Sequence, residues 1–262
     1  MKNSVLFLAS LALLTSSCGH SYYVPNLQNI PLFRQAGDNS FVVSSGSGFD
    51  DNSIMFDVQG AYALTNHFAV TGGYFSTLQE GNDDPVTDFS KGSMFEIGAG
   101  IYQPLGEIGS FDFIGGYGNG KQYHEYNTNT YDIDYYEMGD LKTETGAASL
   151  RYNRFFARSS IGLTTRIIDL AFSARISNMN YYDVNAHIEG QGIESSTLRR
   201  LPGLSCWWFE PAVTLRLGYS PVKLQLQVSL SEPLEENYPA SPTLCANLGL
   251  VFSIPQAKTP RP

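Results

Sequence analysis

The chain has 262 residues, which is enough for one large all-β domain and requires no second domain. Only 16% of the residues are charged, which argues against an ordinary soluble domain, in which about 25% are charged. The formal net charge of −9 argues against nucleic acid or another polyanion as a partner.

The amino terminus predicts export. Lys2 precedes the apolar run Val5–Leu14, which is too short to cross a bilayer as a helix, because that takes about 20 residues. Residues 1–17 are therefore predicted to be a signal peptide that is removed. The small residues directly before Cys18 resemble the lipobox of bacterial lipoproteins, although Thr15 stands where that motif usually carries an aliphatic residue.

This resemblance implies that Cys18 becomes the acylated first residue of the mature protein, and cleavage nearby without a lipid is the alternative. Residues 19–22 contain no acidic cluster of the kind that resembles a surface-export signal in some lipoproteins. The lipid on Cys18 is therefore expected on the periplasmic leaflet of the outer membrane.

Residues 18–38 are predicted to form an extended segment that carries the anchor, because their prolines remove backbone donors and hold the preceding residues extended. The stretches that carry a family resemblance are Tyr-x-Pro-Asn at 23–26, Asn-x-Pro-Leu-Phe at 29–33 and Gln59–Leu64. They resemble a group of uncharacterised Bacteroidota-type lipoproteins of the outer-membrane β-barrel kind. The resemblance implies a location in the outer membrane and implies no activity.

Residues 39–255 show alternating apolar and polar residues. In Val222–Leu230 the apolar side chains take the even positions and the polar ones the odd positions, which is the period of a strand with one apolar face. The predicted strands are Asn39–Ser47, Ser53–Leu64, Phe68–Ser76, Gly92–Tyr102, Phe111–Gly118, Leu150–Thr164, Ile167–Tyr181, Phe209–Tyr219, Val222–Leu230 and Leu244–Ile254. Residues 256–262 are predicted to be a C-terminal tail.

The connections between these strands alternate in length. Tight turns are predicted near 65–67, 103–110, 165–166 and 220–221, and long polar loops at 77–91, 119–147, 182–206 and 231–242. This alternation is typical of an antiparallel up-and-down transmembrane β-barrel with short periplasmic turns and long outer loops. Both termini, and with them the lipid, are expected on the side of the short turns.

If the apolar face meets lipid, the polar face lines the lumen. Buried charges of both signs should pair, because an unpaired buried ion is costly. One network is predicted near the loops, from Asp57, Glu96, Arg158, Arg175 and Glu210, and a second, lower one from Asp112, Asp169, Arg216 and Lys223. A barrel of this size is narrow, so a lumen filled by side chains is expected, with a selective channel for small ions as the alternative.

Aromatic residues cluster at both ends of the predicted strands. Those at the loop ends are Trp207, Trp208, Tyr181, Tyr182, Tyr152 and Tyr74, and those at the turn ends are Tyr62, Phe68, Tyr102 and Tyr219. These positions predict two aromatic girdles at the membrane interfaces.

Two cysteines remain besides Cys18. Cys206 and Cys245 are predicted to share the inward face near the loops, in a compartment where disulfides persist. A third strand between theirs would hold them ~9–10 Å apart, beyond the ~7 Å limit for a bridge. The sequence therefore leaves a disulfide between them open.

Catalysis has little support in the sequence. Some ten-stranded outer-membrane barrels are proteases with a His–Asp pair and paired aspartates at the rim. A rim hydrolase is therefore a remote alternative, for which the candidates are His124, Asp83–Asp84 and His187 with Glu189. The acidic loop residues lack the spacing of a calcium loop, and there is no nucleophile, phosphate-binding or metal motif. The sequence therefore predicts no enzyme, no metal and no cofactor.

The predicted role is structural, binding or that of a narrow channel, with membrane lipid as partner through Cys18 and the barrel wall, and no protein partner is indicated. A soluble, lipid-tethered periplasmic barrel that encloses a hydrophobic ligand is the alternative. The two arrangements invert each other, so they differ in whether Leu224 or Gln225 faces outward.

Overall fold

The computed structural model describes residues 23–48, 53–83, 86–134, 137–189, 198–235 and 242–254. Ten strands are formed: β1 (Asn39–Gly48), β2 (Ser53–Ala63), β3 (Phe68–Asp83), β4 (Val86–Leu105), β5 (Gly109–Asp134), β6 (Glu137–Thr164), β7 (Ile168–Glu189), β8 (Ser205–Tyr219), β9 (Val222–Pro233) and β10 (Thr243–Phe252). Residues 198–200 form one helical turn. In the described part of the chain, no helix has the length and apolar character needed to cross a bilayer.

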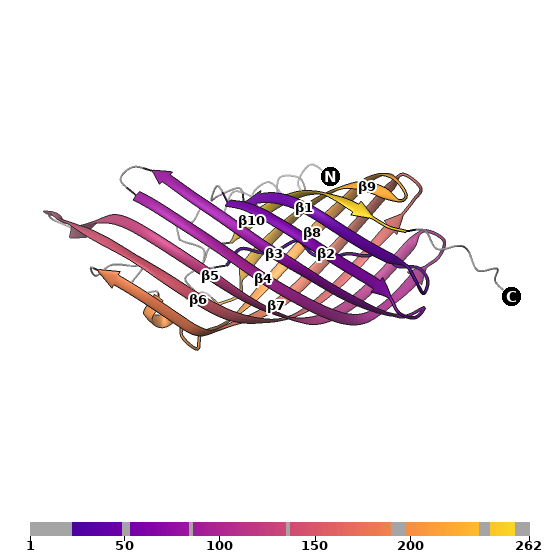
Figure 1. Ribbon diagram of the computed structural model, residues 1–262, viewed down its shortest axis with the longest axis horizontal. Coiled ribbons are helices and arrows are strands. Elements are labelled where there is room, and N and C mark those ends of the chain that lie inside the picture. The colour runs from indigo at the N-terminus through magenta and orange to yellow at the C-terminus, as the bar shows by residue number, and fades with distance from the viewer. Residues whose placement is uncertain are drawn as a thin grey trace, which may run out of the picture.

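The strands form a closed barrel in which each is antiparallel to its sequence neighbours (Figure 1). Closure joins the first strand to the last, with Phe41 opposite Phe252 and Gly48 opposite Cys245. The predicted ten-stranded up-and-down barrel is therefore confirmed. We call the end with the connections 64–67, 106–108, 165–167 and 220–221 the turn end, and the opposite end the loop end.

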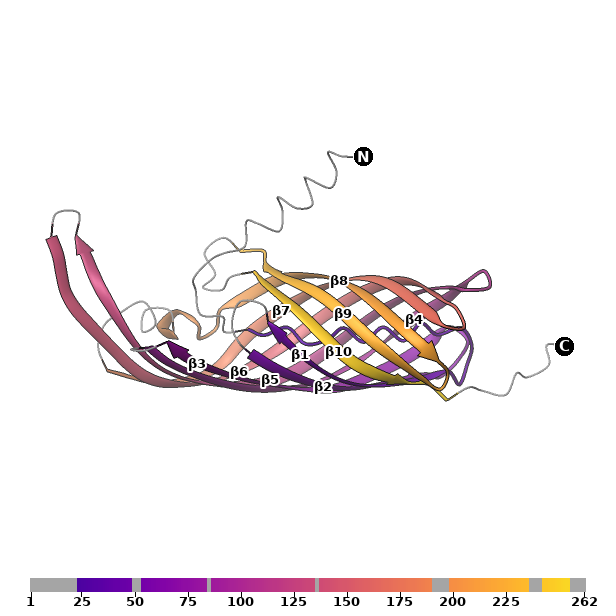
Figure 2. The same ribbon diagram turned by 90° about the horizontal axis from the view of Figure 1, so that it is seen from above.

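Two predicted loops are largely strand. β5 and β6 remain paired out to Asp134 and Glu137, so most of the predicted loop 119–147 is a hairpin that extends far beyond the barrel (Figure 2). β3 and β4 likewise pair out to Asp83 and Val86. Alternation fails to reveal these extensions, because a hairpin with water on both faces needs no apolar side, while its backbone ladder is unchanged.

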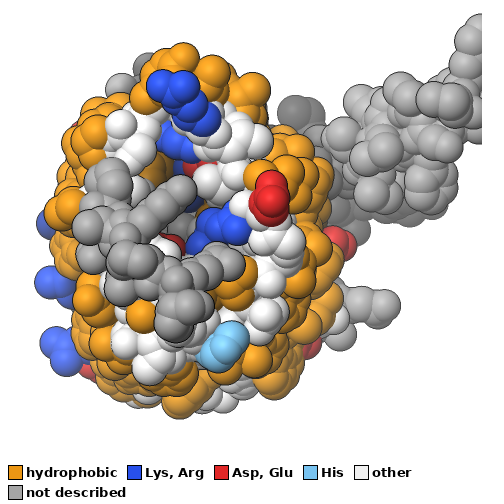
Figure 3. Space-filling model, turned by 90° about the vertical axis from the view of Figure 1, so that its right-hand side faces the viewer, with side chains coloured by type: hydrophobic (Ala, Val, Ile, Leu, Met, Phe, Trp, Pro, Cys, Tyr) orange, Lys and Arg blue, Asp and Glu red, His pale blue; other side chains and the backbone are white. Residues whose placement is uncertain are grey.

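The apolar face of the wall points outward. Leu224 is 47% exposed while Gln225 is 1% exposed, and the same alternation continues along β9. Hydrophobic side chains surround the barrel when it is seen from the turn end (Figure 3). Such an outer band is what a transmembrane barrel presents to lipid, so the inverted arrangement, a soluble barrel around a hydrophobic ligand, is wrong.

The lumen is filled by the chain's own N-terminal segment. Residues 23–33, which we call the plug, have no regular secondary structure and are all buried inside the barrel, where they appear as an indigo tube (Figure 2). The ring of Tyr23 lies 4.7 Å from that of Trp208 at the loop end, and the ring of Phe33 lies 5.8 Å from that of Tyr102 at the turn end. The plug therefore runs the length of the lumen from the loop end to the turn end.

This direction corrects one expectation. β1 begins and β10 ends at the turn end as predicted, where Asn39 and Ile254 are hydrogen-bonded to each other. Tyr23, however, lies at the opposite end, so the described chain does not begin on the side of the short turns. The reversal takes place at Gly37, whose φ of 85° suits glycine and whose amide donates to Ala63 at 2.8 Å.

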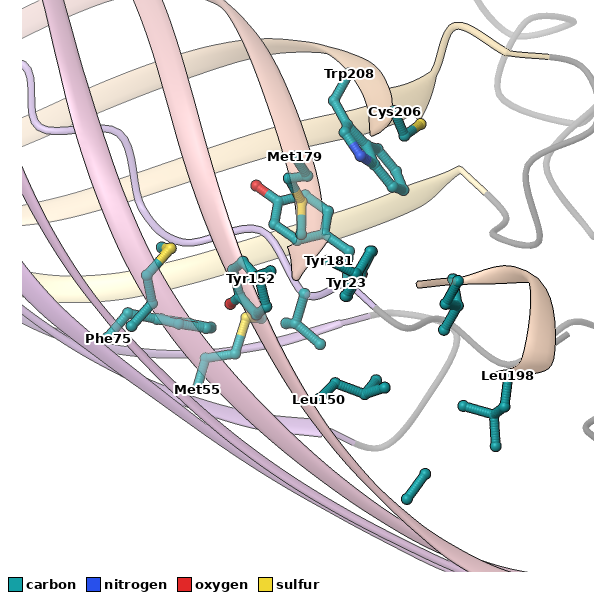
Figure 4. Close-up of a cluster of buried hydrophobic side chains, with 14 of the residues drawn as sticks. Tyr23, Met55, Phe75, Leu150, Tyr152, Met179, Tyr181, Leu198, Cys206 and Trp208 are labelled. Atoms are coloured by element: carbon teal, nitrogen blue, oxygen red, sulfur yellow. The ribbon is translucent and has the colours of Figure 1, made fainter. Parts of the chain in front are cut away.

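A hydrophobic cluster closes the lumen at the loop end (Figure 4). It packs Tyr23 of the plug against wall residues and against Leu198 of the helical turn; the other labelled members are Met55, Phe75, Leu150, Tyr152, Met179, Tyr181, Cys206 and Trp208. Only part of the predicted aromatic girdles therefore faces lipid. Trp207 is 50% exposed while its neighbour Trp208 is fully buried, because adjacent residues of a strand point to opposite faces.

The remaining girdle residues divide in the same way. Tyr74 and Tyr182 at the loop end are exposed, as are Tyr62, Phe68 and Tyr219 at the turn end. Tyr152, Tyr181 and Tyr102 are buried in the lumen, and for these three the girdle assignment was wrong.

Candidate functional site: the plugged lumen

A buried group of charges surrounds Asn26 of the plug. Arg175 donates two hydrogen bonds to the carboxylate of Glu210, at 2.7 and 2.9 Å, and Arg154 forms an ion pair with Glu96. Both guanidinium groups also donate to the side-chain oxygen of Asn26, each at 2.9 Å. One amide of the plug therefore bridges two ion pairs that belong to four different strands.

Tyr23 connects the same group to the loop-end cluster. Its hydroxyl donates to Glu210 at 2.7 Å and accepts from Arg154 at 2.7 Å. Ser177 also donates to Glu210, at 2.6 Å. The two arginines and two glutamates balance in charge, and Arg154, Arg175 and Glu210 each have several partners, which is the condition under which buried ions are tolerated.

Wall side chains in the middle of the lumen bind the backbone of the plug. The amide of Leu27 donates to Asp57 at 2.9 Å, and its carbonyl accepts from Gln59 at 2.6 Å. At the next residue, Gln227 accepts from the amide of Gln28 at 2.7 Å and donates to its carbonyl at 3.0 Å. An extended chain without a strand partner needs such contacts, because unsatisfied buried backbone groups are costly.

A second group of charges lies nearer the turn end. Arg158 pairs with Asp112 at 2.9 Å, and Lys223 pairs with Asp169 at 2.6 Å. Arg216 donates to the carbonyl of Ile30 in the plug. The turn-end half of the lumen therefore also holds the plug through its backbone.

The predicted lumen residues are all buried or nearly so, but their grouping differs in two places. Arg158 belongs to the lower group rather than to the group around Glu96. Asp57 binds the plug backbone and Gln59, and no ion pair of the described residues includes it.

The arginine that pairs with Glu96 is Arg154, which was not among the predicted lumen residues. Arg154 lies four residues before Arg158 on β6 and has the same inward phase, so the alternation could have revealed it. Tyr23 and Asn26 carried no such signal, because the plug has no strand periodicity.

A cavity of about 590 Å³ opens below the plug at the turn end, and its lining includes Leu32, Arg34, Arg216 and Lys223. The blue side chains visible within the opening in Figure 3 show that cationic groups face this entrance. Because plug residues form part of its lining, this cavity is a vestibule on one side of the plug.

The two cysteines near the loop end are not joined by a disulfide. Both are buried, and the thiol of Cys206 donates to Glu235 at 2.9 Å. β9 separates their strands, as the sequence suggested, and the spacing of regular strands keeps them apart. Cys18 lies outside the described residues.

Of the residues proposed for a rim hydrolase, His187 and Glu189 line one hollow, and His124 is not part of its lining. His124 lies on β5 and His187 on β7, while Asp84 and the side chain of Asp83 lie outside what is described. His187 is exposed on the outer face, where a hollow of about 560 Å³ also contains Glu125 and Glu189. Among the described residues, no group of three or more His, Cys, Asp or Glu side chains could hold a metal ion.

No family model matches the sequence, and no curated protein matches it with significance. Among solved structures, the outer membrane protease OmpT from Escherichia coli is similar at 9% identity, over 87% of this chain and 99% of that chain, with a TM-score of 0.49. The translocator domain of autotransporter NalP from Neisseria meningitidis is similar at 11% identity, over 96% and 94%, with a TM-score of 0.39. LpxR from Salmonella typhimurium is similar at 9% identity, over 81% and 99%, with a TM-score of 0.39. At such values no activity can be inferred, and the fold assignment rests on the closed ladder of ten strands.

Proposed function

We propose that the protein is a closed, lipid-anchored outer-membrane barrel whose role is structural or binding and which does not act as a channel. The observation that carries this proposal is the plug, held by charged side chains at the loop end, by amides in the middle and by Arg216 toward the turn end. A solute would have to displace these contacts. Each hydrogen bond to a charged group contributes about 1.5–3 kcal/mol, so spontaneous release of the whole plug is unfavourable.

The surface available to a partner is the part of the barrel beyond the membrane. The β5–β6 hairpin, with β3–β4 beside it, extends from the loop end as a paired platform of polar residues. A rigid barrel that supports such a platform is suited to presenting a binding surface, because its base is fixed by the plugged lumen.

The direction of the plug bears on the anchor. Cys18 precedes Tyr23 by five residues, and five residues span at most ~18 Å. A lipid on Cys18 is therefore proposed to insert near the loop end, in the outer leaflet, rather than in the periplasmic leaflet. Support comes from the contacts of Tyr23 with Trp208 and Glu210 at that end.

The closed state can be tested with the full-length chain in planar lipid bilayers. We expect no steady conductance after insertion, because the plug and the loop-end cluster occupy the lumen. Heat-modifiable migration in detergent confirms that the inserted barrel is folded. A steady ion-selective current from the unmodified protein would support the narrow channel instead.

The position of the anchor can be tested separately by cysteine labelling in a Gram-negative host. Ser21→Cys is expected to react with a membrane-impermeant maleimide on intact cells, because Tyr23, two residues later in the chain, lies at the loop end. Glu107→Cys, exposed in a connection at the turn end, is expected to react only after permeabilisation. The parent chain without either substitution gives the background, and labelling of both variants only after permeabilisation would reject the outer-leaflet anchor.

A further inference from the structure

The outer wall of this acidic protein carries one concentration of positive charge. Of the strand residues whose side chains are described, Lys91, Lys121 and Arg151 are the ones with exposed cationic side chains. They lie on the adjacent strands β4, β5 and β6, and Lys121 is directly opposite Arg151 in the ladder. The cations are therefore gathered on one side of the barrel.

Along the barrel axis, these cations lie at the loop-end edge of the apolar outer band. Toward the turn end, the next apolar outward residues are Phe95 and Ile97 on β4 and Phe155 on β6, all exposed. Lys121 and Arg151 come two outward positions beyond Tyr117 and Phe155. They consequently lie where hydrocarbon ends and lipid headgroups begin, on the loop-end side of the membrane.

A groove is present at this place. It has a volume of about 230 Å³, and its lining includes Lys121, Arg151, Tyr74, Tyr182 and Phe95. Two phenol rings, two cations and one apolar ring therefore meet at the headgroup level.

Neighbouring amides fix the floor of this groove. Asn119 donates to Asn153 at 2.8 Å and to the hydroxyl of Tyr182 at 3.2 Å, and Tyr117 donates to Asn153 at 2.5 Å. These contacts orient Tyr182 beside the cations without using Lys121 or Arg151. The cations stay available to a ligand.

Among the described residues, Arg151 has one competing ion pair. Its guanidinium lies 3.7 Å from Asp183, and the Arg151 side chain is 63% exposed. Exposed pairs of this kind are weak, because water screens both charges. A dianionic group can therefore displace Asp183 from Arg151.

We infer that this groove binds the phosphate of an outer-leaflet lipid, with Arg151 and Lys121 on the phosphate and the acyl chains along Phe95 and Phe155. Arginine and lysine donate charge-assisted hydrogen bonds to phosphate oxygens, and tyrosine hydroxyls at the interface can add further donors. Lys91, which lies 5.2 Å from the ring centre of Tyr123, extends the cationic surface toward the solvent. The inference does not depend on the plug.

The test is binding of bisphosphorylated lipid A to the detergent-solubilised full-length protein, measured by native mass spectrometry and by titration. We expect the double variant Lys121→Gln/Arg151→Gln to bind about tenfold more weakly or worse, because at least one charge-assisted hydrogen bond is lost. Arg166→Gln, which removes an exposed cation at the turn end, is the matched control and should bind as the parent does. Heat-modifiable migration shows that each variant is folded.

Two further arms separate the sources of phosphate. Dephosphorylated lipid A should bind no better to the parent than to the double variant, and inorganic phosphate alone should bind far more weakly than the lipid. Equal lipid binding by the parent and the double variant would overturn the inference. Inorganic phosphate that binds as tightly as lipid A would also overturn it, because the groove would then be a general anion site.

Discussion

Replacing residues 23–33 by a glycine–serine sequence of equal length is expected to convert the closed barrel into a conducting pore. The replacement removes every side chain of the plug, including Asn26, which bridges the two buried ion pairs, and Tyr23, which packs in the loop-end cluster. Gln59, Gln227 and Arg216 bind only the backbone of the plug, and these contacts alone are not expected to hold a flexible chain in place. The polar wall of the lumen would then face water. Planar-bilayer recordings should change from no steady current to steady conductance.

The matched control for this experiment replaces residues 256–262 by glycine and serine, which leaves the plug unchanged. If the plug variant fails to show heat-modifiable migration, Asn26→Ala provides the milder case. Its loss leaves both guanidinium groups without their shared acceptor, so brief openings are expected in place of a steady pore. A folded plug variant that stays as closed as the parent would show that the wall side chains alone seal the lumen.

Arg175→Gln is expected to lower the free energy of unfolding by about 3–5 kcal/mol, the usual cost of breaking a buried ion pair from one side. Glu210 would remain almost completely buried and would keep only the hydroxyl donors of Tyr23 and Ser177. The contacts of Arg175 with the side chain and carbonyl of Asn26 would also be lost. Guanidinium unfolding in detergent, followed by heat-modifiable migration, measures the loss.

The double variant Arg175→Met/Glu210→Gln should recover part of this stability, because neither member of the pair is left as an uncompensated charge. Arg166→Gln is the control, since this exposed arginine only approaches the ring of Tyr219, at 5.7 Å, and little change is expected. A single variant Arg175→Gln as stable as the control would mean that Glu210 is solvated by other means and that the buried network contributes little.

The wall of the barrel could be read from the sequence because lipid imposes a simple rule on it. Leu224 must face hydrocarbon and Gln225 must not, and this constraint repeats every second residue along the strands. Beyond the membrane this alternation is not required, and the strands cannot be predicted from it. The β5–β6 extension has water on both faces, so that its strands were predicted as a loop.

Adjacent aromatic residues show the same limit on a smaller scale. Trp207 and Trp208 both lie at the loop end of β8, and their position along the strand alone predicts that both belong to an aromatic girdle. Because adjacent residues of a strand point to opposite faces, only Trp207 faces lipid, and Trp208 packs against Tyr23 in the lumen. Arg154 has the same inward phase as Arg158 on β6, so the alternation alone places it in the lumen.

The sequence by itself determined the strand order, the apolar and polar faces of each strand and the presence of charges of both signs on the polar face, because each follows from local alternation. Only the tertiary structure decided which face points outward and how the lumen is filled. The small inward residue Ser173 donates to Gln28 of the plug, and Arg175 donates to Asn26, over separations of 145 and 149 residues in the chain. Contacts between such distant segments leave no periodic trace, so the plug and its direction through the barrel appear only when the chain is closed.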